Sequence, residues 1–488
     1  MAKPHPFFLL LFVWLLSYTG SAAPAFNSHH QDVYHELLKL KVKSGRALLL
    51  PQQHSNNAAD LLLANYGDFL ELCVQQNQGR LHELLEAQET RLEMLEDLPQ
   101  QDKWVLYAKA EVQMQLAMSK LLFGNRLSAA WDFRKAYLQY SHNVKKHPEF
   151  LPNRKNLGVL QVLIGSVPDK YKWFLSIIGL KGSIRQGMAN LKQATAPENP
   201  FYQEAQLLYV VVKHLTEPEK EVQALKQIKS MAEKQPDNLL FQFVAMHLFK
   251  KARASKEALQ VYLHVPRTKA YLSFPYLHHL AADLYLYRAD YDKSVQENRK
   301  FLELHKGQHY LKSANYKLYL AYALGNHKPQ AQWHLQHVSQ VGIEETEEDR
   351  YAARYALKQE PLVKPLMQAR LYSDGGYYQE ALQELKKLHI STKTPVAIQA
   401  EYYYRKARIY HGTDSLQQAL PLYKQAISLC EGTDLYFAPS ASLQLGYVYQ
   451  ELKQINTARL YFKQALSYKQ HEYKNSIDAK AKLALSAM

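Results

Sequence analysis

Apolar residues recur along this chain at the three- and four-residue spacing of amphipathic helices, in segments separated by short polar turns. Turn-forming residues mark the joints, as in Gln235-Pro236-Asp237-Asn238 and Gly325-Asn326-His327. Between Gln31 and Leu98 the pattern gives three amphipathic helical stretches. No stretch of the sequence shows the sustained two-residue alternation of a β-strand. The pattern therefore predicts an all-α chain.

Small and large residues repeat at a fixed spacing near the C-terminus. Three registers share this spacing: Leu445-Gly446-x-x-Tyr449 with Ala458-x-x-x-Phe462-x-x-Ala465; Ala407, Tyr410, Ala419, Tyr423 and Ala426; and Ala369, Tyr372, Ala381, Leu385 and Leu388. Only glycine or alanine fits where the two helices of a hairpin cross most closely, which explains Gly446 and Ala458. Large residues such as Phe462 fill the space toward the next hairpin, because one hairpin cannot bury its apolar face alone. This is the tetratricopeptide repeat pattern.

Weaker versions of the register extend the repeat toward the N-terminus. They begin at Ala117, Met246, Ala282 and Tyr319. Together with the C-terminal three, they predict a right-handed α-solenoid of about eight or nine tetratricopeptide-type hairpins. We expect an N-terminal helical cap over residues 26–100, divergent repeats over 101–342 and regular repeats over 343–488.

One repeat is interrupted by an insertion. Leu157-Gly158 opens it, but the small residue that should pair with Gly158 comes only at Gly187, about 17 residues later than the repeat allows. The insert covers about 165–182 and contains the aromatic and aliphatic stretch Trp173–Leu180. Burial of this stretch across the solenoid is favoured, and a peripheral membrane contact through Trp173–Leu180 stays open.

The N-terminus has the features of a secretory signal peptide. Lys3 precedes an apolar run from Phe7 to Leu16, and the small residues of Ala23-Pro24-Ala25 predict cleavage after Ala25. The first cysteine is Cys73, so no acceptor thiol for a lipid anchor follows this site. No Asn-x-Ser/Thr glycosylation acceptor occurs, which favours a bacterial envelope. We expect an exported protein of the periplasm or outer envelope that is not lipid-anchored.

The interrupted repeat and its flanks resemble a known family. The motifs that carry the resemblance are Leu157-Gly158, Pro168-Asp169-Lys170, Trp173–Leu180, the return from Gly182 to Gly187, Leu121-Leu122-Phe123-Gly124 and Trp131-x-x-Arg134-x-Ala136. They are similar to the tetratricopeptide repeat domain 39 and inclusion-body clearance family over about residues 100–300. The resemblance implies an adaptor without catalysis. Eukaryotic members of that family are intracellular, so it implies neither the compartment nor the partner of this chain.

The net charge of the chain indicates which class of partner it favours. The 60 Lys and Arg residues outnumber the 45 Asp and Glu residues, and the net charge of +15 favours an anionic partner or surface. Nucleic acid is disfavoured by export and by basic residues that are dispersed along the chain.

The chain has two cysteines. Cys73 and Cys430 are too few for a disulfide framework, and each lies in a helical pattern where a buried thiol is the simpler interpretation.

No motif predicts a catalytic, cofactor or metal site. Gly182-x-x-x-x-Gly187 resembles a phosphate-binding loop, but Met188-Ala189 stand where lysine and a hydroxyl residue are required. His334 and His337 share a helical face and lack an assured third metal ligand, as do His278 and His279 near Asp283. No nucleophile, base and acid have a distinctive spacing. The acidic run 344–349 is expected to be a solvated helix start.

The predicted function is binding on the concave face of the solenoid, without catalysis. The first helix of each hairpin should line this face, which places there the pairs Leu366 with Arg370, Tyr404 with Arg408, and Leu443 with Tyr447. Tyrosine and arginine dominate binding hot spots. The predicted partner-binding residues are Arg370, Tyr404, Arg405, Arg408 and Tyr447. We expect a scaffold for a protein or peptide, and the alternative is an envelope protein that binds a glycan or nutrient.

Overall fold

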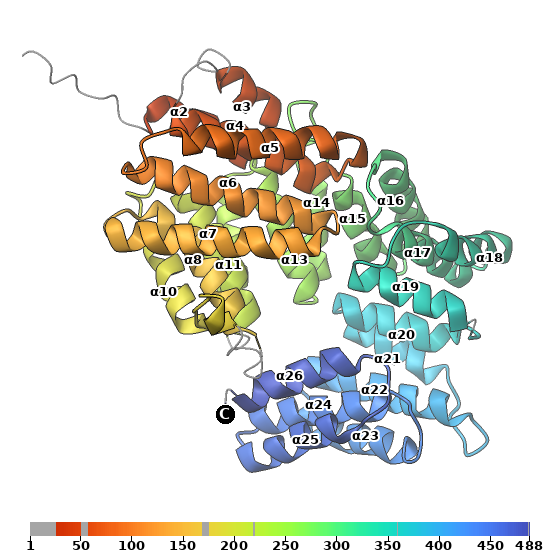
Figure 1. Ribbon diagram of the computed structural model, residues 1–488. Helices are drawn as coiled ribbons and strands as arrows, with labels where there is room; N and C mark the ends of the chain where they lie inside the picture. The colour runs from red at the N-terminus through yellow and green to blue at the C-terminus, as the bar shows by residue number, and fades with distance from the viewer. Residues whose placement is uncertain (1–25, 50–56, 168–174, 218–219, 359, 487) are drawn as a thin grey trace, which may run out of the picture. The chain divides into compact units, whose positions relative to one another are not determined.

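The structure is a computed structural model that describes residues 26–49, 57–167, 175–217, 220–358, 360–486 and 488. This part of the chain is all helical and contains no strand (Figure 1). The predicted all-α fold is confirmed. The predicted signal peptide, and the part of the insert from 168 to 174 with Trp173, lie outside the described residues.

The chain divides into two compact units. Of the described residues, the first unit comprises those up to 241 together with 266–273, and the second comprises 242–265 together with those from 274 onward. Within each unit, consecutive helices pack as hairpins, so the fold is an α-solenoid. The predicted boundary at 342–343 separates divergent repeats from regular repeats in the sequence, and it stays a prediction.

Helices α2 to α12 build the first unit. Their bounds are α2 Ser28–Leu38, α3 Val42–Leu49, α4 Ala58–Gln75, α5 Leu81–Glu96, α6 Lys103–Leu122, α7 Arg126–Lys146, α8 Pro152–Gly165, α10 Ile184–Ala194, α11 Tyr202–Thr216 and α12 Glu221–Lys234. Helices α2 to α5 pack on one another, and α4 and α5 also pack on α6. They occupy the residues for which the sequence predicts a helical cap. The hairpins α6–α7, α8–α10 and α11–α12 follow.

A buried lysine ties five helices of this unit together. Lys155 of α8 is fully buried, and its Nζ lies 2.9 Å from Glu111 Oε1 of α6 and 2.8 Å from Glu204 Oε2 of α11. The hydroxyl of Tyr140 on α7 donates to Glu111 Oε2 at 2.6 Å, and that of Tyr34 on α2 donates to Glu204 Oε2 at 2.9 Å. Each carboxylate is therefore paired and hydrogen-bonded, as a buried charge must be.

The α8–α10 hairpin closes around the two glycines that the repeat spacing pairs. A Cβ atom on Gly187 would lie 2.4 Å from the carbonyl oxygen of Gly158, too close for any other residue without a shift of the backbone. The described part of the insert returns along α7. There Arg134 Nε donates to the carbonyl of Ile178 at 2.7 Å, and the Tyr137 hydroxyl donates to the carbonyl of Lys181.

Helices α14 to α26 build the second unit, and its boundary with the first falls within α13. The bounds are α13 Leu239–Lys251, α14 Ser255–His264, α15 Tyr276–Tyr287, α16 Tyr291–Leu304, α17 Leu311–Leu324, α18 Lys328–His337, α19 Glu347–Lys358, α20 Lys364–Gly375, α21 Tyr378–Lys386, α22 Val396–Gly412, α23 Leu416–Leu429, α24 Phe437–Glu451, α25 Ile455–Ser467 and α26 Lys474–Ser486. The hairpins are α15–α16, α17–α18, α20–α21, α22–α23 and α24–α25. Helix α19 lies outside this pairing and packs on α17, and α26 packs on α24 and α25.

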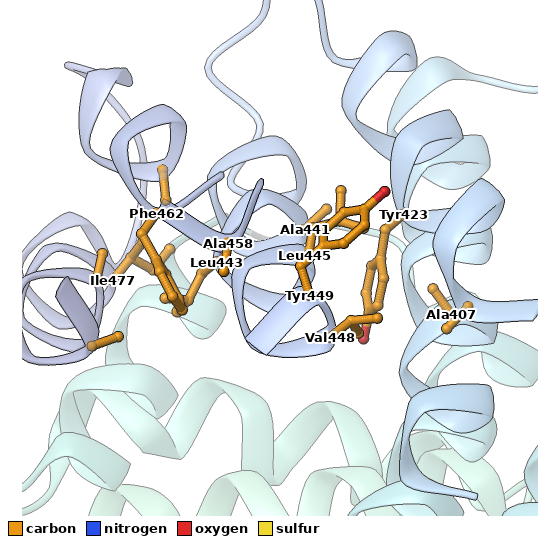
Figure 2. Close-up of a cluster of buried hydrophobic side chains, with 14 of the residues drawn as sticks. Ala407, Tyr423, Ala441, Leu443, Leu445, Val448, Tyr449, Ala458, Phe462 and Ile477 are labelled. Atoms are coloured by element: carbon orange, nitrogen blue, oxygen red, sulfur yellow. The ribbon is translucent and has the colours of Figure 1, made fainter. Parts of the chain in front are cut away.

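The last repeats share one apolar core (Figure 2). Ala407, Tyr423, Ala458 and Phe462 are fully buried in it. A Cβ atom on Gly446 would lie 2.4 Å from the Phe462 ring, so Gly446 makes room for the residue one helical turn beyond Ala458. The register predicted from the sequence places small and large residues correctly, and the closest partner of Gly446 is this aromatic ring.

The acidic run 344–349 is only partly solvated, so the expectation of an exposed helix start is wrong for its last residues. The Glu347 side chain is 82% exposed, as expected. Asp349 is fully buried, because its carboxylate accepts the backbone N–H groups of Tyr310 at 2.6 Å and Ser313 at 3.0 Å. Asp349 thus caps the N-terminus of α17 from a different helix, a role that local sequence does not reveal.

Candidate functional site: the arginine groove

Three adjoining cavities of about 320, 490 and 220 Å³ hollow the second unit. Tyr351, Arg370 and Tyr473 line all three cavities, so the cavities adjoin and are described together as one groove. We name it the arginine groove, and we refer to its parts as the 320, 490 and 220 Å³ cavities.

The first helices of the hairpins supply most of the groove. Its lining residues come from α13, α15, α17, α19, α20, α22, the start of α24 and the adjoining turns. Among the residues that line the three cavities, none belongs to the second helices α16, α18, α21, α23 or α25. Successive repeats therefore present the same face of each first helix to the groove. The sequence predicts that the first helices line a concave binding face, and that role stays a prediction.

The 220 Å³ cavity concentrates positive charge. Four arginines line it, against the single carboxylate of Asp374. The arginines are Arg253, Arg370, Arg405 and Arg408, and the tyrosines beside them are Tyr351, Tyr404, Tyr436 and Tyr473. Arginine offers a planar fork of donors that matches a carboxylate or a phosphate. The cavity therefore brings together side chains that can donate hydrogen bonds to an anionic group.

The arginines are held in place, and nearby carboxylates compensate their charge only in part. Arg370 donates to the Tyr351 hydroxyl, its guanidinium lies 4.9 Å from the Tyr351 ring centroid, and its Nε is 3.6 Å from Asp374 Oδ2. Arg408 donates to the side-chain carbonyl of Gln444, a neutral partner. Among the described residues, neither Arg408 nor Arg253 has a carboxylate within ion-pair distance. Net positive charge therefore remains available to a ligand.

Arg405 is more fully compensated than the other arginines. Its Nη2 lies 2.8 Å and its Nε 3.0 Å from Glu401 Oε1, one turn earlier on α22. The side chain is 13% exposed. This pairing holds the Arg405 guanidinium at the junction of the 220 and 490 Å³ cavities.

Six apolar side chains are among those that line the 490 Å³ cavity. They are Leu362, Val363, Leu366, Met367, Ile398 and Phe437. Acidic and basic residues are equally represented around this cavity, so it has no dominant charge. An apolar side chain of a ligand would gain free energy by leaving water here, at about 25 cal/mol per Å² buried.

A closed charge network forms the floor of the 320 Å³ cavity. Lys317 Nζ lies 2.8 Å from Asp283 Oδ1, 2.8 Å from Glu348 Oε2 and 2.8 Å from His279 Nε2, and Lys250 also pairs with Asp283. Burial raises the pKa of Asp283, but Lys250 and Lys317 outweigh burial and hold that pKa below its usual value. These groups satisfy one another, so the network fixes α13, α15, α17 and α19 together.

Four of the five predicted partner-binding residues meet in the 220 Å³ cavity: Arg370, Tyr404, Arg405 and Arg408. The fifth, Tyr447, lines none of the three cavities. Its ring packs edge-on against Phe462 at 5.2 Å, within the core that α26 joins through Ile477. Tyr447 has the same place in its repeat as Arg370 and Arg408 have in theirs. In the last repeat this position packs into the core and does not line the groove. The binding role of these residues stays a prediction.

The sequence pattern does not predict several residues that line the groove. Tyr351 and Arg354 come from α19, which has no repeat signature, and Arg253, Tyr436 and Tyr473 come from turns. Arg354 lies over the Tyr473 ring at 5.3 Å, although the two residues are far apart in sequence. Only the excess of basic over acidic residues in the whole chain hints at such a surface.

The motifs considered for metal or phosphate chemistry have structural partners. His278 pairs with Glu297 at 2.6 Å, and Trp333 stacks on His337. In the described ranges, no group of three or more His, Cys, Asp or Glu side chains is placed to hold a metal ion. A Cβ atom on Gly182 would meet the Gln161 carbonyl at 2.7 Å, so this glycine serves close backbone packing.

Comparison with known proteins identifies the repeats. A tetratricopeptide repeat family model matches residues 400–433 and 439–472, which cover α22 to α25. No curated protein sequence matches the chain. The resemblance to the tetratricopeptide repeat domain 39 and inclusion-body clearance family is not confirmed by these comparisons.

Solved structures with low sequence identity are similar over much of the chain. The "Human IFIT1 dimer with PPP-AAAA" has 15% identity, covers 88% of this chain and 94% of its own, and has a TM-score of 0.33. A tetratricopeptide repeat protein from Parabacteroides merdae has 17% identity, covers 65% of this chain and 96% of its own, and has a TM-score of 0.21. The P58(IPK) TPR domain has 12% identity, covers 87% and 98%, and also has a TM-score of 0.21.

Proposed function

We propose that this α-solenoid, with tetratricopeptide repeats at residues 400–433 and 439–472, is a protein-interaction scaffold that holds an acidic segment of a partner protein in the arginine groove. Binding is the whole of its mechanism, and no catalytic step is proposed. The observation that carries the proposal is the 220 Å³ cavity, where four arginines surround one carboxylate.

The charges of this cavity define the first feature of the ligand. An anionic group that enters it approaches Arg370, whose Nε lies 3.6 Å from Asp374 Oδ2, and Arg408, whose hydrogen bond goes to the neutral side chain of Gln444. Charge-assisted hydrogen bonds from arginine are about twice as strong as neutral ones. The tyrosine rings around them add contact area and hydroxyl groups for further hydrogen bonds.

The neighbouring cavity defines the second feature. The 490 Å³ cavity shares Arg370 and Arg405 with the anionic site and offers apolar side chains such as Leu366 and Ile398. A ligand that fills both carries an acidic group beside an apolar side chain. An extended peptide segment meets this requirement, because successive side chains can enter successive cavities. Nucleic acid carries repeated phosphates and lacks aliphatic side chains, so it matches the groove less well.

The proposed setting is the bacterial envelope, after export and removal of residues 1–25. This part of the proposal rests on the signal-peptide pattern and on the absence of an Asn-x-Ser/Thr acceptor in the sequence. A glycan or nutrient is the alternative ligand, since tyrosines beside arginines and carboxylates also suit an acidic sugar.

A peptide array and a glycan array, probed with the labelled full chain, test the proposal. The peptides share one set of apolar residues and carry Glu, Gln or Lys at the neighbouring positions. We expect capture of the Glu series, with an affinity that falls as salt concentration rises. Binding to the glycans alone, or equal binding to the Glu and Lys series, would overturn the proposal.

Charge reversal in the groove provides the matched comparison. The Arg370→Glu/Arg408→Glu variant should lose about tenfold or more in affinity for the Glu peptides, which corresponds to about 1.4 kcal/mol. The control variant Lys424→Glu/Lys463→Glu makes the same change in net charge at exposed positions of the second helices α23 and α25. Circular dichroism should show the same helicity for both variants. Equal loss of affinity in both would mean that binding follows net charge and not the groove.

A further inference from the structure

Helix α7 of the first unit carries a second apolar stripe on its outer side. Its inner stripe is buried and includes Ala129, Ala136 and Tyr140. Leu127 and Trp131 are 82% and 59% exposed, and each lies two residues from Ala129, about 200° around the helix axis. Isolated exposed apolar residues are ordinary, but two large ones spaced by one turn on the same outer face form a stripe.

The described part of the insert extends this stripe. Ile177 is 71% exposed, and the next residue is fixed to α7 by the hydrogen bond between Arg134 and the Ile178 carbonyl. A Cβ atom on Gly179 would lie 3.6 Å from Leu138, which is itself 36% exposed. Leu127, Trp131, Leu138 and Ile177 therefore belong to one outward surface, which we name the α7 face.

Basic residues outnumber acidic residues in the segment of the sequence that contains α7. Residues 120–192 contain 13 Lys and Arg but only 3 Asp and Glu, so this segment carries most of the chain's net charge of +15. Several of the cations lie on or beside the α7 face. Arg134 lies over the Trp131 ring at 5.9 Å, Lys135 is 62% exposed, and Lys181 is exposed at the end of the insert. The expectation that basic residues are dispersed along the chain is wrong for this segment.

The exposed apolar side chains and the positive charge of the α7 face favour an anionic bilayer over a second copy of the chain as its partner. A second copy of the chain would bring an equally positive segment against the first, and like charges oppose that contact. An anionic bilayer offers negative headgroups to the lysines and arginines and an apolar layer to Leu127, Trp131 and Ile177. Tryptophan is enriched at this boundary, because its ring is apolar and its N–H is polar.

We propose that the α7 face docks on the surface of a lipid bilayer that contains anionic lipid. The chain would lie on the bilayer, held by partial insertion of the apolar stripe and by the surrounding cations. Among the described helices, none combines the length and the apolar character that a membrane span requires. Docking of this kind is separate from ligand capture in the arginine groove, and neither proposal requires the other.

Co-sedimentation of the full chain with vesicles tests the proposal. Vesicles of phosphatidylcholine with phosphatidylglycerol should bind the protein, and pure phosphatidylcholine vesicles should bind it less. The variant Leu127→Gln/Trp131→Gln should reduce binding to the anionic vesicles about tenfold or more, because it removes the inserting side chains. Both positions are exposed, so the fold should survive the change, as circular dichroism will show.

The control variant Leu357→Gln/Leu460→Gln removes two apolar side chains that are 79% and 67% exposed in the second unit. It should bind the vesicles as the unchanged protein does. A second variant, Lys135→Glu/Lys181→Glu, should weaken binding to anionic vesicles only. Equal binding by the stripe variant and its control would overturn the proposal. Dimers in the absence of lipid that disappear in the stripe variant would also overturn it, since they would make a second copy the occupant.

Discussion

Replacing the buried Lys155 of the first unit should reduce stability more than replacing an exposed lysine does. Lys155→Met would leave the Glu111 and Glu204 carboxylates without their shared cation, and Glu111 is only 1% exposed. Removing one partner of a buried ion pair costs about 3–5 kcal/mol. We therefore expect a large fall in the free energy of unfolding, measured by urea denaturation.

The exposed Lys424 supplies the control, since Lys424→Met should change the free energy of unfolding by less than about 0.5 kcal/mol. Adding Glu204→Gln to Lys155→Met should recover part of the loss, because one uncompensated carboxylate is removed. Stability that is unchanged in Lys155→Met would mean that the two carboxylates find other partners.

Two covered histidines should make the second unit sensitive to acid. Burial, followed by the charges of His279 and His309, lowers the pKa of His305 to about 4. Burial, followed by the charges of Arg299 and His337, lowers the pKa of His334 to about 4. The unfolded chain binds these protons near pH 6.5, so it takes them up before the folded chain does. Stability should be full above about pH 7 and should fall as the pH drops from 6.5 toward 4.

Urea denaturation at several pH values checks this dependence. His305→Phe should weaken it, because the ring already stacks on Phe301 and its Nε2 has no hydrogen-bond partner in the described part of the chain. His82→Asn, at a side chain that is 94% exposed, should leave the dependence unchanged. A flat stability profile between pH 7 and pH 5 would contradict the assignment.

At the residue scale, the repeat register predicts which positions of successive first helices are equivalent. Arg370 and Arg408 each follow the small residue of a first helix, and both line the 220 Å³ cavity. Tyr447 occupies the same register and packs against Phe462, because α26 covers the last repeat. Tyr351 and Tyr473 lie outside the repeat register, so no periodicity could place them in the groove.

At the element scale, close packing in the last hairpin depends on the absence of a side chain at Gly446. Gly446→Ala places a Cβ atom 2.4 Å from the Phe462 ring, and overpacking of this kind costs about 1–3 kcal/mol. In a Phe462→Leu background the same substitution should cost less, since the smaller side chain leaves room. Thermal unfolding of the four proteins in this double-mutant cycle measures the coupling. Additive effects would mean that the ring does not limit the approach of α24 and α25.

The local sequence pattern predicts the interrupted hairpin correctly, but it does not predict the burial of Asp349. The spacing of Gly158 and Gly187 predicts a hairpin interrupted by an insert, and the two glycines do meet across it. The composition of the acidic run 344–349 predicts a solvated start of helix α19. Asp349 is buried instead because it caps α17, a partner that lies in a different helix and that no local pattern indicates.

At the scale of the whole molecule, stability should not depend on redox conditions. Cys73 and Cys430 are both free thiols. The melting temperature should therefore be the same with and without a reductant, because no disulfide constrains the unfolded chain. Calorimetry in both conditions is the measurement. A lower melting temperature in the presence of reductant would reveal a covalent link between chains or within one.

The same two thiols make the natural chain a ready background for site-specific photo-crosslinking. Burial raises the pKa of the Cys73 thiol to about 12 and also raises that of Cys430, so both react slowly with maleimides at neutral pH. A single new cysteine at Ala397, an exposed residue that lines the 490 Å³ cavity, would carry nearly all of an attached photo-reactive label. Irradiation in intact cells would then attach whatever occupies the groove to a known position, without first removing either native cysteine.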